Sequence, residues 1–468
     1  MKRQNIKGKE NILKITKLEV TTDTLTSRGG LLLFWRYISN IGILTLFEKF
    51  FSGLRKSKKG AGIVGLFKQL LCFFYDGTSR HLTFFDQLKN DEGYAGILEE
   101  EPSNLVSSHQ LKRFFNLFSN FCSNLFRLIL KRLFLFRLHL LKPEIIELML
   151  DTMVMNNDEA LKRQGVEPTY KKVKGFHPLH LIWCGKIVDA IFRGGKKSGN
   201  YGDVVLNMVR ELVDLIRRKY SASVPIILRC DGGFFDEKNF EGFDKLNIGF
   251  ISGGKMYESV KNYVKSSDKS DWEIYENGRD GWEYIEFGWR CACWNRFYRT
   301  FYTRPFYLDH QRIFEFARPD NVIITNLGIN KEVFCGLADE RVEELISGAG
   351  IIKSHHQRGA DELPHRGLKD FGFEELPFKR FSCNTAFYYC MVIAFFLFEI
   401  FKEDVLSGVG VVDVKSYATT VRRKVLDFAG KIVKTGGRAI LKVSESVMKG
   451  LKLSELWSRC QSPPVLLL

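Results

Sequence analysis

Two aspartates lie in or directly after apolar runs that predict β-strands, and their carboxylates could hold metal ions. Asp151 lies within the run Ile145–Met155, and Asp231 follows the run Val224–Leu228. Carboxylate oxygens and water are the ligands that Mg²⁺ and Mn²⁺ prefer. Two such ions about 4 Å apart commonly serve phosphodiester chemistry, because one activates the attacking oxygen and the other stabilises the leaving oxygen. Either aspartate alone is more typical of a turn or a helix cap, so a two-metal site requires a third carboxylate.

A third carboxylate lies in the segment His355–Lys369, whose sequence is HHQRGADELPHRGLK. The spacing of Arg358, Glu362 and Lys369 resembles the signature Tyr-x2-Arg-x3-Glu-x6-Lys of transposases from cut-and-paste insertion sequences. His355 stands at the tyrosine position of that signature. Arg358 and Glu362 would share one face of a helix. This resemblance implies that Glu362 binds metal and that Arg358 and Lys369 bind DNA phosphates. Arg358 would do so through its planar, two-pronged guanidinium group, and Lys369 through the single charge of its ammonium group.

Three further segments extend the resemblance. Leu150-Asp151-Thr152 resembles the first-aspartate motif of the family. The segment Arg229–Phe235, RCDGGFF, resembles the second, in which serine usually stands at the position of Gly232. The basic and apolar run Lys424–Leu441 resembles the C-terminal tail. Over about residues 30–445, the chain therefore resembles the transposase DDE domain of bacterial insertion sequences, group 1, in insertion sequence family thirteen-eighty.

The resemblance implies a ribonuclease H-like α/β fold, in which the first and fourth strands are neighbours and would bring Asp151 and Asp231 together. It implies metal-dependent DNA strand cleavage and strand transfer, with two Mg²⁺ or Mn²⁺ ions as cofactors. In such a reaction an insertion sequence is transposed by a cut-and-paste route that passes through a DNA hairpin. The implied partners are double-stranded DNA, namely the terminal inverted repeats of the element, and a second copy of the chain in a homodimer. The implied location is the bacterial cytoplasm, in association with the nucleoid.

The glutamate segment also departs from the family pattern. His355 lacks the phenol that the signature tyrosine would bring to a phosphate or a base. Pro364 and Gly367 fall within the expected helix, where a proline costs about 3 kcal/mol or forces a kink. We expect a kink, because none of the three acids is lost. Asp361 is an alternative metal ligand, although the spacing to Lys369 favours Glu362.

The charge distribution predicts a polyanionic partner. The net charge is +16. Residues 1–142 contain 23 Lys and Arg against 11 Asp and Glu, and residues 411–468 contain 11 against 4. Basic ends around a slightly acidic centre fit a protein that grips DNA at both ends of the chain, although a basic face is also often merely solvated.

Other features of the composition exclude some classes of protein. The longest apolar run, Ala386–Phe398, is shorter than the roughly 20 residues that a membrane span needs, so we expect no membrane partner. The ten cysteines are scattered without zinc or disulfide spacing, which predicts reduced thiols in a cytosolic protein.

Apolar spacing predicts a mainly helical domain over residues 1–142, and its surplus of positive charge makes this domain the candidate for binding the DNA ends. Helices are expected at Leu31–Phe51 and Ile63–Tyr75, and a capping box at Ser107 and Gln110.

The remaining chain predicts an α/β core with an insertion. Residues 143–254 follow the order β-β-β-α-β-α-β, which indicates a mixed sheet. Residues 346–405 complete this core with the glutamate helix and a long apolar helix. The aromatic-rich residues 255–345 predict an inserted antiparallel β region, and residues 406–468 form a basic tail.

Aromatic and histidine side chains offer further sites. Trp282, Trp289 and Trp294 could stack on a base flipped out during hairpin formation, although tryptophans in strands are more often core residues. A transition-metal site is less favoured, because no His-x3-His helix pair with a partner acid is present among His177, His180, His355 and His356.

Two other functions remain open from the residues alone. The first is a catalytically inactive or domesticated DNA-binding protein derived from a transposase, which metal-dependent strand cleavage would exclude. The second is a nuclease of the same fold, which would hydrolyse DNA without joining ends.

Overall fold

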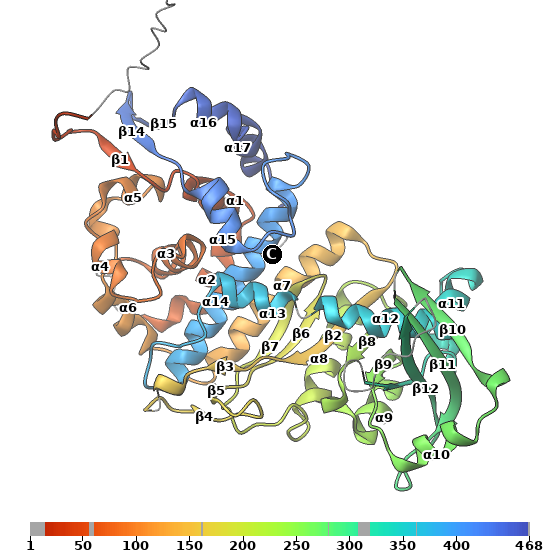
Figure 1. The fold of residues 1–468 in the computed structure, drawn as a ribbon. Helices are drawn as coiled ribbons and strands as arrows, with labels where there is room; N and C mark the ends of the chain where they lie inside the picture. The colour runs from red at the N-terminus through yellow and green to blue at the C-terminus, as the bar shows by residue number, and fades with distance from the viewer. Residues whose placement is uncertain are drawn as a thin grey trace, which may run out of the picture.

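The computed structural model describes residues 15–55, 60–160, 162–278, 280–307, 319–361 and 363–466, without the side chains of residues 307, 331 and 358–361. In these residues a helical region and a large mixed β-sheet lie side by side (Figure 1). The protein is therefore of the α/β class, as the sequence predicts.

The N-terminal helices begin and end at local sequence signals. Gly42, at φ 85°, separates two helices where the sequence predicts one over Leu31–Phe51, because a residue in the left-handed region interrupts a helix. The predicted capping box is confirmed, since Ser107 and Gln110 each accept the other's backbone N–H. The α-helices described before the sheet are α1 (Leu31–Asn40), α2 (Ile43–Phe51), α3 (Ile63–Asp76), α4 (Phe84–Leu88), α5 (Glu92–Ile97), α6 (Ser108–Phe115) and α7 (Cys122–Leu141).

Within the described residues, nine strands form one sheet in the order β10-β11-β12-β13-β9-β8-β2-β6-β7. The five strands expected in the core form one half of it: β9 (Gly249–Gly253), β8 (Ile226–Cys230), β2 (Ile146–Thr152), β6 (Leu179–Trp183) and β7 (Lys186–Ile191). β8 pairs in parallel with both β2 and β9, and the pairs β2–β6 and β6–β7 are antiparallel. The expected adjacency of the first and fourth strands, β2 and β8, is thus confirmed.

The aromatic-rich strands continue the same sheet. They pair in antiparallel fashion, and β13 joins them to β9. These strands are β10 (Glu273–Asn277), β11 (Asp280–Trp289), β12 (Tyr298–Tyr307) and β13 (Asn321–Thr325). A separate small sheet beside the core contains β3 (Met155–Asn156), β5 (Lys174–Phe176) and β4 (Glu167–Pro168).

Helices cover both faces of the large sheet. Asp151 and His180 are register partners on one face, which also receives side chains from the helices after β13. Asp189 points to the opposite face, where Arg127 and Lys131 of α7 bind it. The helices after β7 are α8 (Val204–Lys219), α9 (Glu237–Lys245), α10 (Glu258–Ser266), α11 (Asp339–Ile346), α12 (Gly348–Asp361), α13 (Leu363–Phe371) and α14 (Phe381–Phe401).

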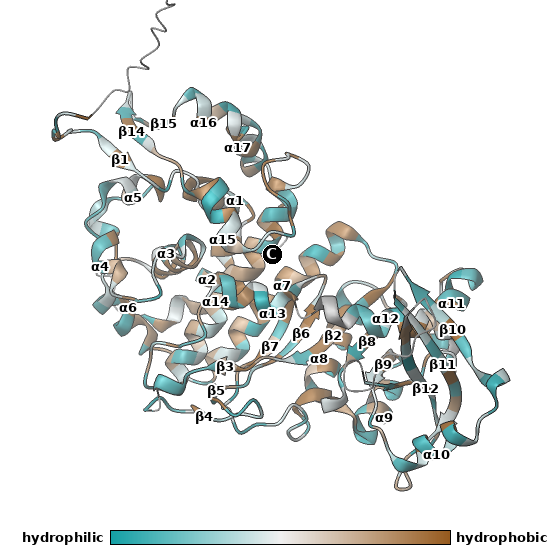
Figure 2. Ribbon diagram, viewed as in Figure 1, coloured by the Kyte–Doolittle hydropathy of each residue, from teal (hydrophilic) through white to brown (hydrophobic). Residues whose placement is uncertain are grey.

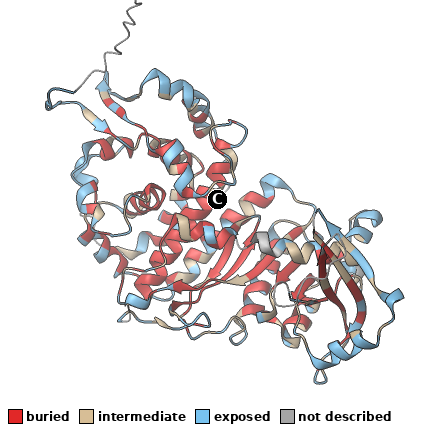
Figure 3. Cartoon of the chain, viewed as in Figure 1, coloured by how far each residue is buried: buried red, intermediate tan, exposed pale blue. Residues whose placement is uncertain are grey.

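Helix α14 is apolar on every side and lies between the helical region and the sheet (Figure 2). The segment Phe381–Leu406 is long and apolar enough to cross a membrane by composition, but 89% of its most apolar window is buried inside the structure. Figure 3 shows this buried stretch meeting the buried faces of the N-terminal helices and the sheet. The helix therefore behaves as the core helix of a globular protein.

The two ends of the described chain come together. Strand β1 (Thr24–Thr26) pairs with β14 (Gly430–Thr435), which forms a hairpin with β15 (Arg438–Lys442). The remaining C-terminal helices are α15 (Ala418–Val421), α16 (Glu445–Gly450) and α17 (Leu453–Gln461). The side-chain amide of Asn40 in α1 donates to the carbonyl of Cys460 in α17 at 2.8 Å.

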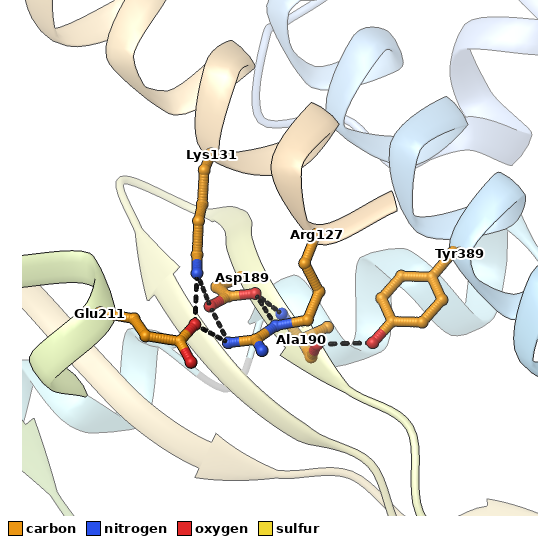
Figure 4. A network of polar contacts seen from close by, with 6 residues as sticks. All are labelled: Arg127, Lys131, Asp189, Ala190, Glu211 and Tyr389. Atoms are coloured by element: carbon orange, nitrogen blue, oxygen red, sulfur yellow. Dashed lines mark hydrogen bonds and ion pairs between the residues drawn. The ribbon is translucent and has the colours of Figure 1, made fainter. Parts of the chain in front are cut away.

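A buried ion-pair network fixes α7 to the sheet (Figure 4). Arg127 binds both carboxylate oxygens of Asp189 at 2.8 Å. Lys131 lies 3.3 Å from Asp189 and 2.7 Å from Glu211 of α8. The side chain of Asp189 is fully buried, whereas that of Glu211 is 50% exposed. Such a buried carboxylate depends on both cations, because an unpaired buried charge is costly.

Removing Asp189 should destabilise the protein far more than removing Glu211. Asp189→Ala leaves two largely buried cations without their main counter-charge, so we expect the free energy of unfolding to fall by about 3–5 kcal/mol. Glu211→Ala is the matched control, since exposed ion pairs contribute about 0–1 kcal/mol. Urea unfolding followed by circular dichroism measures both variants. Equal losses would show that the buried pair does not hold α7 on the sheet.

Candidate active site

The parallel pairing of β2 with β8 positions two carboxylates at one edge of the sheet. Leu150 and Cys230 are the last paired residues of the two strands. Asp151 and Asp231 follow them directly, so both side chains leave neighbouring strands at the same level. Both aspartates are half-buried. The apolar strands thus bring the acids together through main-chain hydrogen bonds.

Asp231 is held by the turn that follows it. Its Oδ1 accepts the backbone N–H of Gly233 at 2.9 Å, which caps the short 3₁₀ turn Gly232–Phe234. A Cβ added at Gly253, at the end of β9, would lie only 3.0 Å from the backbone nitrogen of Gly232. Glycine at 253 therefore lets β9 approach the site closely. A Cβ at position 232 would meet its nearest neighbour at 3.5 Å, so the serine usual in the family would fit there.

Asp151 contacts both its own backbone neighbour and a histidine. Its Oδ1 accepts the N–H of Thr152 at 2.6 Å. Its Oδ2 lies 3.6 Å from Nδ1 of His365 in α13. Helix α13 can pack this closely on α14 because a Cβ at Gly367 would already lie 3.0 Å from the ring of Phe395.

A chain of buried polar groups leads away from Asp151. Nε2 of His365 lies 2.9 Å from Nδ1 of His180, and Nε2 of His180 hydrogen-bonds to the hydroxyl of Tyr388 in α14. Burial, with smaller effects of nearby lysines, lowers the pKa of His365 to about 4. Burial also lowers the pKa of His180 well below its usual range and raises the pKa of Tyr388 well above it. All three groups are therefore neutral at neutral pH.

This edge suits a hard divalent cation. Asp151 and Asp231 offer carboxylate oxygens, and the neighbouring His365 is neutral, so its charge does not oppose a cation. Among the described residues, no group of three or more His, Cys, Asp or Glu side chains is placed to hold a metal. A third ligand would have to come from elsewhere in the chain.

Glu362, the expected third acid, lies outside the described residues, as do the side chains of Arg358 and Asp361. Helix α12 runs to Asp361 and helix α13 starts at Leu363. Pro364 is the second residue of α13, and the expected kink just after Glu362 lies outside the described residues. The guanidinium of Arg229 in β8 donates to the side chain of Gln357 in α12 at 3.2 Å, so α12 packs on the sheet face that carries Asp151.

Lys369 lies in α13 beside a charged cleft. Its Nζ is 3.0 Å from the carboxylate of Glu374. The cleft has a volume of about 840 Å³ and opens between the N-terminal helices and the core. Besides Lys369, its charged lining residues are Arg80, Lys112, Asp158, Glu159, Arg163, Glu374 and Glu375.

The three tryptophans occupy different environments. Trp282 and Trp289 lie on opposite faces of β11, since they are seven positions apart and side chains alternate along a strand. Trp282 is half-buried, and its ring lies 4.4 Å from that of His356 in α12. Trp289 is buried and donates to Ser259 in α10 at 3.1 Å. Trp294 is buried against Phe235, with ring centres 4.9 Å apart.

The histidines considered for a transition metal are dispersed. His177 bonds to the carbonyl of Lys197 at 2.6 Å, and His180 belongs to the chain that reaches Asp151. His356 packs on Trp282, and the half-buried His355 has its ring centre 5.9 Å from that of His356.

Sequence reasoning missed His365 and Tyr388 and gave His180 no role beside Asp151. His365 lies only three residues after Glu362, within the recognised segment. Nothing local links these residues, because His180 is separated from His365 by 185 positions and from Tyr388 by 208.

Comparison with known proteins assigns the family. The chain matches the family described as transposase DDE domain group 1 over residues 12–464. No curated protein sequence matches it. Among solved structures it is similar to the piggyBac transposase in a synaptic complex with hairpin DNA, determined by cryo-electron microscopy. That similarity has a TM-score of 0.39 and 11% identity, covering 95% of this chain and 85% of the other. Because the family match spans nearly the entire sequence, the chain belongs to the transposase DDE domain group 1 family.

Proposed function

We propose that this protein is an active transposase with a ribonuclease H-like core that cuts and rejoins DNA in a metal-dependent, cut-and-paste reaction. The observation that carries the proposal is the parallel β2–β8 pair, whose last paired residues are followed directly by Asp151 and Asp231 at one edge of the sheet. Membership of the family supplies the class of reaction. The substrate is double-stranded DNA, at the terminal inverted repeats of an insertion sequence.

The residues of the chain would divide the work as follows. Asp151, Asp231 and Glu362 hold two Mg²⁺ or Mn²⁺ ions. When bound, these ions supply activation of the attacking oxygen and stabilisation of the leaving oxygen. Arg358 and Lys369 hold phosphates of the DNA backbone. Nζ of Lys369 lies 3.0 Å from the carboxylate of Glu374. On DNA binding, a phosphate would replace this carboxylate as the partner of Lys369.

The DNA grip would use the two basic ends of the chain. The β1–β14 pair brings the N-terminal and C-terminal segments together. The β14–β15 hairpin presents Lys434, Arg438 and Lys442, all exposed. The sequence concentrates positive charge in these same two regions. We infer that the joined ends hold the terminal repeats, in a complex that contains two copies of the chain.

Neutralising the acids should abolish cleavage and leave DNA binding intact. Asp151→Asn, Asp231→Asn and Glu362→Gln each remove one charged metal ligand. Loss of several kcal/mol of transition-state stabilisation corresponds to about a thousandfold slower cleavage or more. Asparagine at 231 can still accept the Gly233 N–H, so this variant separates the metal role from the turn cap. Cleavage of labelled repeat DNA and a binding assay provide the two measurements.

Asp361→Asn is the matched control for the third acid. Normal cleavage by Glu362→Gln together with inactive Asp361→Asn would assign the third ligand to Asp361. Normal cleavage by Asp151→Asn or Asp231→Asn would contradict the proposed reaction, and a wild-type protein that binds but never cleaves would be an inactive DNA-binding derivative.

Neutralising the hairpin should weaken DNA binding in a salt-dependent way. The triple variant Lys434→Gln, Arg438→Gln, Lys442→Gln removes up to three phosphate contacts. Each contact contributes about 0.9 to the slope of log affinity against log salt concentration, so the slope should fall by about 2–3. Binding titrations at several salt concentrations measure the slope.

A second triple variant is the control for this experiment. Lys245→Gln, Lys261→Gln, Lys265→Gln neutralises exposed residues of α9 and α10, at the far end of the molecule from the hairpin (Figure 1). An equal fall in slope for both variants would mean that the joined ends are not the DNA-binding surface.

Trp282 is the tryptophan that we propose stacks on a flipped base. Its half-buried ring lies on the β11 face that packs on α12, next to His356, whereas Trp289 and Trp294 are buried in the core. Stacking of one base is worth about 1–3 kcal/mol. Trp282→Ala should therefore slow hairpin formation about tenfold to a hundredfold without slowing first-strand nicking, and Trp282→Phe should retain most of the rate. A wild-type rate for Trp282→Ala on a pre-nicked substrate would exclude this role.

A further inference from the structure

We propose that His365, His180 and Tyr388 form a hydrogen-bonded positioning chain that orients the carboxylate of Asp151 for metal binding. The proposal rests on the proposed function of Asp151 as a metal ligand. None of the three residues touches the DNA or the metal in this scheme. They act through Asp151 and are therefore positioning residues.

The geometry of the chain is continuous from the edge of the sheet to its core. Asp151 and His180 are register partners on adjacent strands, so their side chains lie on the same face. His365 of α13 lies 3.6 Å from Asp151 and 2.9 Å from His180. Tyr388 of α14 closes the chain at Nε2 of His180. His180 and Tyr388 are fully buried, and His365 is 9% exposed.

The proton positions follow from the chemistry of the first group. A metal-binding carboxylate is ionised and can only accept hydrogen bonds. When the 3.6 Å contact to Asp151 tightens to a hydrogen bond, Nδ1 of His365 carries the proton, and the other nitrogen of a neutral imidazole is an acceptor. Nδ1 of His180 must therefore donate to His365, and Nε2 of His180 must accept from the hydroxyl of Tyr388. Ionised Asp151 thus selects one tautomer for both histidines.

A neutral donor has a specific advantage at this position. It can restrain one oxygen of Asp151 and leave the full negative charge of the carboxylate for a cation. A lysine or arginine at the same position would repel the cation. The 3.6 Å separation from His365 is longer than a hydrogen bond, and such contacts often tighten only in the functional complex. Groups that orient a metal ligand in this way typically change metal affinity or activity by about 10-fold to 100-fold.

The tautomers can be measured without any enzymatic assay. ¹⁵N-histidine labelling and two-bond ¹⁵N–¹H NMR of the full-length protein assign the protonated nitrogen of each ring, with His180→Gln and His365→Asn used to identify the signals. We expect both histidines to carry the proton on Nδ1. An Nε2–H tautomer at either position would overturn the proposal.

The metal requirement gives an independent measurement. His365→Phe removes the donor to Asp151, so the Mg²⁺ concentration for half-maximal cleavage should rise about 10-fold to 100-fold. His365→Asn retains an N–H near the position of Nδ1 and should restore most of the affinity. A Mg²⁺ dependence unchanged in His365→Phe would overturn the proposal, as would equal defects in the two variants.

Two adjacent tyrosines provide a matched pair if substitutions at 365 prevent folding. Tyr388→Phe removes the last donor of the chain. Tyr389→Phe removes an equally buried hydrogen bond from the same helix, because the hydroxyl of Tyr389 donates to the carbonyl of Ala190 at 2.7 Å. Only Tyr388→Phe should mix the histidine tautomers and raise the Mg²⁺ requirement. Equal behaviour of the two variants would overturn the proposal.

Failure of the positioning chain can be told apart from failure of the proposed function. A wild-type protein that does not cleave repeat DNA in Mg²⁺, or an Asp151→Asn variant that cleaves normally, counts against the function. In that case the tautomer measurement still tests the chain, because it needs no activity.

Discussion

The burial of α14 is the constraint on which the rest of the structure depends. A helix that is apolar on every side must be enclosed by other elements. Helices α3 and α7 from before the sheet, and β7 within it, all pack on α14. One continuous hydrophobic core consequently extends from Leu31 to Leu466. Because α14 follows the sheet in sequence, the N-terminal helices complete their packing only when this later part of the chain is present.

The same helix also contributes to the surroundings of Asp151 at the sheet edge. Tyr388 projects from α14 to His180, and the close approach of α13 at Gly367 brings His365 between His180 and Asp151. The packing of two helices thus determines which groups surround the first carboxylate. Asp231 is restrained differently, by the backbone of its own turn. One acid therefore depends on tertiary packing and the other mainly on local geometry.

Charge in this protein is arranged in two distinct ways. Inside, Arg127 and Lys131 are neutralised by Asp189 and Glu211, which joins α7 to the sheet. Outside, the exposed cations of the β14–β15 hairpin lie beside the first described strand of the chain. In the first arrangement the cations are paired and largely buried, so losing Asp189 would leave uncompensated buried charge. The second leaves positive charge in water, where it can attract a polyanion over a distance set by ionic strength.

Much of the fold was predictable because it is encoded in neighbouring residues. Apolar runs predicted β2 and β8, and apolar residues at helical spacing predicted α8. Ser107 with Gln110 predicted a helix start that the structure confirms. The resemblance to a family predicted that β2 and β8 are adjacent, which the pairing confirms. The break at Gly42 was not predicted, because a left-handed glycine inside an apolar helical pattern leaves the periodicity nearly unchanged.

The sequence by itself therefore determined the positions of the main elements, the family and two candidate carboxylates. Only the tertiary structure decided that β13 joins the aromatic strands to β9, since edge pairing depends on main-chain groups that are common to all residues. It alone decided that His365, His180 and Tyr388 converge behind Asp151. Their contacts arise when α13 and α14 pack on the sheet. The spacing of residues along the chain does not predict such long-range packing.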